Sequence, residues 1–224
     1  MNTTKRISSI SPSLTLAITA KAKAMKAEGK SVVGFGAGEP DFNTPQHIID
    51  AAKKALDDGC TKYTPSSGLP ALRKKIAEKF KEEQGLDYDP SQIIVSSGAK
   101  HSIFNAMFAL VEDGDEAIIP APYWLTYPEV VKVCGGKSVF VEGHKENHFK
   151  ISPEDLEKAI TPKTKMLIFN SPSNPTGAVY TEEEIRALAA VVEKAGIWVL
   201  SDEIYSKLIY DGVKHFSMAQ VSDK

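Results

Sequence analysis

The sequence contains little that would tie the protein to a membrane, to nucleic acid or to a metal. Two cysteines, Cys60 and Cys134, among 224 residues are too few for a disulfide framework or a cysteine-based metal site. The five histidines have no spacing typical of metal ligands, so we expect no metal. A formal net charge of -2 argues against binding nucleic acid or an anionic membrane through charge. No apolar run approaches the length of a membrane span.

The composition and the N-terminus indicate a soluble, cytoplasmic protein. Hydrophobic residues make up 42% of the chain and charged residues 25%, which is ordinary for a globular protein with a sizeable core. The first ten residues, MNTTKRISSI, lack the apolar centre of a secretory signal. The cytoplasm is therefore the expected location.

Capping residues, prolines and glycines mark where helices begin and end. Ser13 is expected to begin a helix that runs to about Glu28 and stops at Gly29. Thr44 and Pro45 are typical of a cap and a first helical residue. The other expected helices are, in chain order, Leu72 to Phe80 with a stop at Gly85, Ile103 to Val111, Pro128 to Val133, one beginning at Ser152, and Thr181 to Ala195.

Five short apolar runs alternate with these helices and are predicted to be strands. Continuously apolar strands between helices are typical of an α/β fold, with a mainly parallel sheet and helices on both faces. Ligands of such sheets bind beyond the carboxyl ends of the strands. The predicted strands are residues 92–96 (QIIVS), 116–120 (EAIIP), 137–141 (KSVFV), 165–170 (KMLIFN) and 197–201 (IWVLS).

Small, aromatic, amide and acidic residues follow these strands, and topology predicts that they converge at one edge. The segment 96–100 (SSGAK) is suited either to binding an anion at a helix N-terminus or to a tight turn capped by Ser97. Trp124 is suited either to stacking on a flat ring or to core packing.

The two remaining strand ends carry an amide and an acid. Prolines in NSPSNPTG would fix the Asn174 amide in one orientation, either for a ligand or in a constrained loop. Asp202 follows a buried strand and needs a partner, which is a cationic ligand atom, a basic side chain or solvent. The glycine-rich segment 34–42 (GFGAGEPDF) lacks the dinucleotide spacing, which excludes a nicotinamide cofactor.

Six motifs in this order resemble the class I/II aminotransferases that use pyridoxal phosphate (fold type I), particularly the bacterial aspartate aminotransferase subgroup. The resemblance covers nearly the whole chain. It implies transfer of an amino group, most simply from aspartate, to a 2-oxo acid such as 2-oxoglutarate in a homodimer. The motifs are GAGEPDF (36–42), TKYTPSSGLPALR (61–73), SSGAKHSIFNA (96–106), PAPYWLTYPE (120–129), NSPSNPTGAVY (170–180) and SDEIY (201–205).

The resemblance implies a role for each matching residue. Asp202 would pair with the pyridine nitrogen of the cofactor, and Tyr205, with Asn174, would bond its phenolic oxygen; Asp202 and Tyr205 are the expected catalytic residues of this chain. Trp124 would stack on the ring. The remaining implied positions are Gly98, Ala99 and Lys100 around the phosphate, Tyr63 reaching the phosphate of the neighbouring subunit, and Gly38, Trp124 and Asn174 against the substrate.

One expected residue has no match in this sequence. The lysine that forms the Schiff base follows SDEIY by about thirty residues in the family, and this chain ends at Lys224. Neither Lys100, Lys207 nor Lys224 has the expected context. We therefore expect the N-terminal portion of an aminotransferase, with residues 1–44 from the small domain and 45–224 an incomplete large domain. The alternatives are a related carbon–sulfur lyase, or a non-catalytic module.

Overall fold

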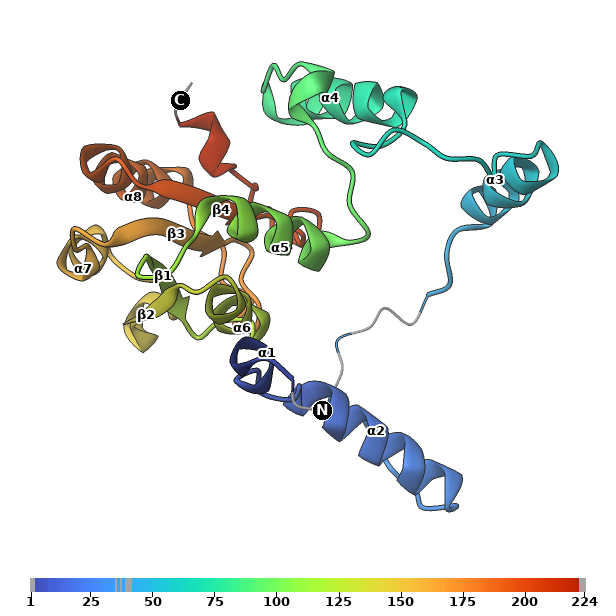
Figure 1. Ribbon diagram of the computed structural model, residues 1–224, viewed down its shortest axis with the longest axis horizontal. Helices are drawn as coiled ribbons and strands as arrows, with labels where there is room; N and C mark the ends of the chain where they lie inside the picture. Colours follow the sequence, from blue (N-terminus) through green and yellow to red (C-terminus); the bar gives the residue numbers. More distant parts are fainter. Residues whose placement is uncertain (1–2, 35, 37, 39–41, 222–224) are drawn as a thin grey trace. The chain divides into compact units, whose positions relative to one another are not determined.

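The computed structural model describes residues 3–34, 36, 38 and 42–221, which form two compact units (Figure 1). The first, here the sheet unit, joins residues 1–10 to residues 67–224, and the second, here the helical unit, comprises residues 11–66. Each unit is described by itself. The division at residue 44 concerns the domains of a complete aminotransferase, and it stays a prediction.

The helical unit contains α2 (Leu14–Ala27) and α3 (Gln46–Asp57). The Ser13 hydroxyl accepts a hydrogen bond from the backbone N–H of Leu16, the third residue of α2, as its predicted capping role requires. Helix α3 begins one residue later than expected, because Pro45 is the N-cap residue and not the first helical residue. No side chain makes a capping hydrogen bond there. The extended ψ of Pro45, 140°, keeps that residue outside the helix.

A parallel four-stranded sheet forms the centre of the sheet unit and confirms the predicted fold class (Figure 1). Its spatial order is β2-β1-β3-β4, so the chain crosses from β2 past β1 to reach β3. Such order requires crossover connections, which the helices between the strands provide. The strands are β1 (Glu116–Ala121), β2 (Lys137–Glu142), β3 (Thr164–Asn170) and β4 (Trp198–Asp202).

The structure describes all of residues 92–96 and places none of them in a strand, so the prediction of a strand there is wrong. The first of these residues belongs to the short 3₁₀ helix η1 (Pro90–Gln92), and the next four are in no regular secondary structure. The Val95 N–H instead donates to the carbonyl of Ser67, 3.0 Å away, and the Ile94 side chain is 69% exposed. An apolar run favours extended backbone, but a strand also needs a neighbouring backbone to pair with.

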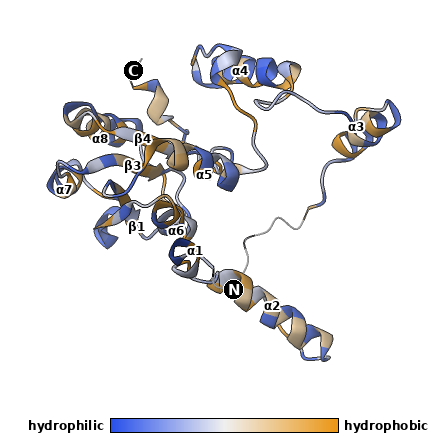
Figure 2. Cartoon of the chain, in the orientation of Figure 1, coloured by the Kyte–Doolittle hydropathy of each residue, from blue (hydrophilic) through white to orange (hydrophobic). Residues whose placement is uncertain are grey.

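The predicted helices around the strands are all present. Helix α8 shows why the local signals succeed: the Thr181 hydroxyl accepts from the Glu184 N–H (3.2 Å), while the Glu184 carboxylate accepts from the Thr181 N–H (2.8 Å). Helix α8 carries both hydrophilic and hydrophobic residues, as expected for a helix with one face on the core (Figure 2). The helices of the sheet unit are α1 (Lys5–Ser8), α4 (Pro70–Gln84), α5 (Ala99–Leu110), α6 (Thr126–Val133), α7 (Pro153–Ala159) and α8 (Glu182–Ala195), with η2 (Lys145–Asn147) and η3 (Met218–Gln220).

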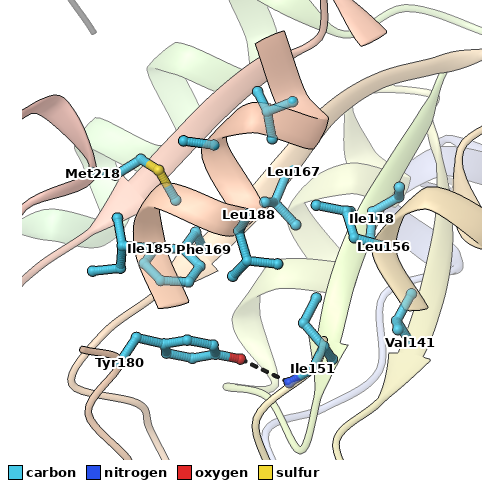
Figure 3. Packing of buried hydrophobic residues seen from close by; sticks show 12 residues of the cluster. Ile118, Val141, Ile151, Leu156, Leu167, Phe169, Tyr180, Ile185, Leu188 and Met218 are labelled. Atoms are coloured by element: carbon cyan, nitrogen blue, oxygen red, sulfur yellow. Dashed lines mark hydrogen bonds between the residues drawn. The ribbon is translucent and has the colours of Figure 1, made fainter. Parts of the chain in front are cut away.

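Alternate residues of the strands feed two separate cores, one on each face of the sheet. Ile118, Leu167 and Phe169 pack against Leu156 of α7 and Leu188 of α8 on one face (Figure 3). All five side chains are almost fully buried. This period-two alternation is the expected consequence of the strand pleat.

The opposite face is covered by α5 and α6. Ile119 and Ile168, which neighbour the residues above in sequence, pack there with Met107 of α5 and Val131 of α6. Tyr127 of α6 belongs to the same cluster. Helices on both faces leave the carboxyl edge of the sheet as the place where side chains from several strand ends meet.

Candidate functional site

Asp202 ends β4 at the carboxyl edge of the sheet, and its backbone is firmly held. Its Cα pairs in register with that of Asn170, the last residue of β3. The Asn170 side-chain amide donates to the Asp202 carbonyl at 2.8 Å, and the Ser171 N–H donates to the same oxygen at 3.3 Å. The neighbouring strand β3 therefore fixes the backbone position from which the Asp202 side chain extends.

The Asp202 side chain is oriented by two donors. The Tyr127 hydroxyl donates to Oδ2 at 2.7 Å, and the Ile204 N–H donates to Oδ1 at 3.2 Å. The residue is only 8% exposed, and no lysine or arginine among the described residues forms an ion pair with it. A carboxylate has about four lone-pair positions, so Asp202 keeps capacity for a further donor.

Tyr127 is a site residue that the sequence did not reveal. Burial disfavours its phenolate, and the Asp202 carboxylate adds a like charge, so the pKa of the Tyr127 hydroxyl is raised well above its usual range. It therefore stays a proton donor to Asp202 at all ordinary pH values. The one available signal is its place in the PYWLTYPE segment, three residues after Trp124.

The Trp124 ring lies between the core and the site. It makes a T-shaped contact with Tyr127, with a centroid distance of 5.5 Å and an interplanar angle of 90°. The ammonium of Lys100 lies 5.1 Å from the centre of the indole. Trp124 is only partly buried against the α5–α6 core, so packing and presentation of a ring surface are combined in one side chain.

Asn170 links the acid to the loop that carries Asn174. Its side-chain oxygen accepts from the Asn174 N–H at 2.7 Å, while its nitrogen donates to the Asp202 carbonyl. The Asn174 side-chain amide in turn donates to the Tyr205 hydroxyl, at a long 3.4 Å. Asp202, Asn174 and Tyr205 are thus brought together as predicted, through a residue that the sequence did not single out.

The N-terminus of α5 lies beside the same carboxylate. Gly98 is its cap, so the alternative of a cap at Ser97 is wrong, and no side chain bonds the first amides of the helix. Gly98 has φ +84°, and a Cβ placed there would meet nothing within 4 Å, so the backbone is open to close approach. Ala99 and Asp202 both line a cavity of about 300 Å³.

The remaining predicted residues fall elsewhere. Gly38 and Tyr63 lie in the helical unit, so their implied roles stay predictions, and Tyr63 is fully exposed within that unit. Lys207 forms a surface ion pair with Glu83 (2.8 Å), and Lys224 lies outside the described residues.

The described residues hold neither a candidate metal site nor a candidate membrane span. No group of three or more histidine, cysteine, aspartate or glutamate side chains lies close enough to hold a metal there. Among the same residues, no helix has both the length and the apolar character needed to cross a membrane.

Known proteins resemble this chain over its whole length. Residues 30–224 match the family model described as aminotransferase class I and II. The aspartate aminotransferase of Bacillus subtilis (strain 168) is 60% identical over 224 residues, which are 100% of this chain and 57% of that protein. A probable aspartate/prephenate aminotransferase of Rhizobium leguminosarum bv. phaseoli is 53% identical over 96% of this chain and 54% of its own length.

A solved structure agrees with these relatives. The aspartate aminotransferase from Thermus thermophilus with maleate superposes with a TM-score of 0.96 at 45% identity. The match covers 99% of this chain and 58% of that one. The chain thus spans little more than half the length of the proteins it resembles.

Proposed function

Because this chain belongs to the class I and II aminotransferase family, we propose that the protein moves an amino group from an amino acid to a 2-oxo acid. Aspartate aminotransferases of this family use pyridoxal phosphate. The observation that carries the proposal is Asp202, a buried carboxylate at the carboxyl edge of the sheet with no basic partner among the described residues. A carboxylate in that setting favours a cationic N–H as its further partner.

The residues at this edge fit pyridoxal phosphate chemically. Asp202 has an acceptor position to spare for a pyridinium N–H. Tyr205 and Asn174 supply a hydroxyl and an amide that can donate to a phenolic oxygen. The uncapped amides after Gly98, at the positive end of α5, suit the phosphate, and Lys100 adds a positive charge nearby.

When bound, pyridoxal phosphate supplies a ring that withdraws electrons from the α-carbon of the amino acid. The chain's own residues bind and orient. Asp202 holds a proton at the pyridine nitrogen, Tyr127 keeps Asp202 in place, and Trp124 offers its ring surface for stacking. Asn174 and Gly38 would bind the substrate, and Tyr63 would reach the phosphate of a second subunit in a homodimer.

Aspartate is the proposed amino donor and 2-oxoglutarate the proposed acceptor. The names of the relatives from Bacillus and Rhizobium both contain aspartate, and the Thermus structure holds maleate, a dicarboxylate of the same length. The test is oxaloacetate formation from aspartate and 2-oxoglutarate by a chain that includes the Schiff-base lysine, with cystathionine as the alternative substrate. Pyruvate release from cystathionine without transamination would support a carbon–sulfur lyase instead.

An Asp202→Asn variant tests the site itself. An amide cannot hold the nitrogen's proton as an ion pair, so in a chain that includes the Schiff-base lysine kcat should fall by about 100-fold or more. The matched control is Glu157→Gln, which removes an exposed carboxylate paired with Lys194 on the surface. Equal activity of both variants would refute the assigned role of Asp202.

We also propose that residues 1–224 by themselves bind the cofactor without transaminating. Neither Lys100 nor Lys207 has the setting of a nucleophile, because Lys100 lies over Trp124 and Lys207 pairs with Glu83. Borohydride reduction of this chain with pyridoxal phosphate, followed by mass spectrometry, should show no site-specific pyridoxyl adduct. A single modified lysine would contradict this.

A further inference from the structure

Glu203 immediately follows Asp202, yet no motif or mechanism above uses it. Its carboxylate accepts three hydrogen bonds: from the Ser201 hydroxyl (2.8 Å), the Ser217 hydroxyl (2.7 Å) and His215 Nε2 (2.9 Å). The Glu203 side chain is 19% exposed. Most glutamates of a protein lie in solvent, so a largely buried one with three partners calls for an explanation.

The three donors hold the Glu203 side chain as a carboxylate. Burial alone would raise its pKa, but the hydrogen bonds from His215, Ser217 and Ser201, and the charge of the imidazole, outweigh burial and lower it. His215 depends on this contact, because its Nδ1 atom is buried without a hydrogen-bond partner in the described part of the chain. Among the described residues, Glu203 is thus the hydrogen-bond partner of the ring.

These bonds close the loop that follows β4. His215 and Ser217 lie 12 and 14 residues after Glu203, so one side chain at the start of the loop binds its end. Beyond Ser217 the chain is anchored, since Met218 is buried in the α7–α8 core and the Gln220 amide donates to the Gln84 carbonyl at 2.9 Å.

The closed loop carries groups of the candidate site. The Ile204 N–H donates to Asp202 Oδ1, and Tyr205 accepts from Asn174. Backbone bonds within this stretch are short-range: Ser206 N–H to the Glu203 carbonyl and Leu208 N–H to the Tyr205 carbonyl. The middle of the loop is exposed and contributes no core. The Glu203 side-chain bonds therefore join the two ends of the loop directly.

We propose that Glu203 is a positioning residue, which closes the 203–217 loop through His215 and Ser217 and thereby holds Asp202 and Tyr205 in their relative geometry. The functional part of this proposal rests on the proposed function, in which those two residues contact pyridoxal phosphate. Loop closure itself does not depend on the cofactor.

The test compares Glu203→Ala with Glu157→Ala, which removes an exposed carboxylate, in the cofactor-free protein. Hydrogen–deuterium exchange of peptides covering 202–217 should quicken by about tenfold or more in Glu203→Ala, with α8 unchanged. Glu203→Gln should restore part of the protection, because its amide oxygen still accepts from both serines. Unchanged exchange at 202–217, or an equal increase throughout the sheet, would overturn the proposal.

Cofactor affinity separates the two proposals. Pyridoxal phosphate should bind the Glu203→Ala protein about tenfold more weakly than the Glu157→Ala protein. If the unchanged protein does not bind pyridoxal phosphate, the proposed function fails, while the exchange result still decides loop closure.

If Glu203→Ala does not fold, His215→Phe is the second variant. It removes one hydrogen bond and keeps an aromatic ring at position 215, and the same local increase in exchange is required.

Discussion

Replacing Tyr127 by phenylalanine isolates the hydrogen bond that holds Asp202. The phenylalanine ring can keep the contacts of the buried tyrosine, including the edge contact with Trp124. Only the hydroxyl is lost, and with it the 2.7 Å bond to the carboxylate. The change creates no cavity larger than one oxygen atom, so packing contributes little to the outcome.

The expected loss follows from the charge and the burial of Asp202. A hydrogen bond to a charged group contributes about 1.5–3 kcal/mol net, and a carboxylate that is 8% exposed has little access to replacement water. At roughly 2–4 °C per kcal/mol for a chain of this size, Tm should fall by roughly 3–12 °C.

Thermal unfolding followed by tryptophan fluorescence measures the fall in Tm, and urea unfolding measures the loss of free energy. Tyr210→Phe is the control because Tyr210 is an exposed tyrosine. A double-mutant cycle with Asp202→Ala assigns the loss to the pair. The Tyr210 variant should stay within about 0.5 kcal/mol of the unchanged protein. A coupling free energy near zero between Tyr127 and Asp202 would refute the reasoning.

Three further perturbations have defined outcomes. Leu188→Ala removes a fully buried side chain of α8 and should lower the free energy of unfolding by about 2–5 kcal/mol in urea, with an unchanged m-value; a loss below about 1 kcal/mol would contradict the packing. Thr181→Ala breaks the capping box with Glu184 and should cost about 1 kcal/mol by the same assay, whereas Thr181→Ser should cost less. Glu203 has a folded-state pKa below its ordinary value of 4.5, so its contribution is complete above that pH and is lost as pH falls below it. Glu203→Gln should therefore unfold with a weaker pH dependence below about pH 4.5, and an unchanged acid profile would contradict this.

The helices were predictable because their signals are local. Thr181 and Glu184 are three residues apart, and Gly85 ends α4 by its own left-handed backbone conformation. The strand expected at residues 92–96 shows the limit of such reasoning. Its composition favours an extended chain, but forming a strand also depends on the position of another segment with which it can pair.

The site was predictable in outline and not in its contacts. Parallel topology alone brings Trp124, Asn174 and Asp202 to one edge. The bond from Tyr127 to Asp202 spans 75 residues, and that from Asn170 spans 32, and no local pattern encodes either. Such partners become visible only once strand register and helix rotation are known.

Two adjacent acids at the end of β4, Asp202 and Glu203, have different surroundings. Asp202 points toward Tyr127 and the α5–α6 core, whereas Glu203 points toward Ser217, which precedes a residue of the α7–α8 core. Asp202 and Glu203 are therefore not interchangeable, because each has its own local environment. A one-residue insertion or deletion in β4 would turn each acid toward the other side of the sheet. Both acids would then lose their present hydrogen-bond partners, although the composition of the segment would scarcely change. Asp202 and Glu203 should therefore tolerate single substitutions better than a one-residue change of their position along β4.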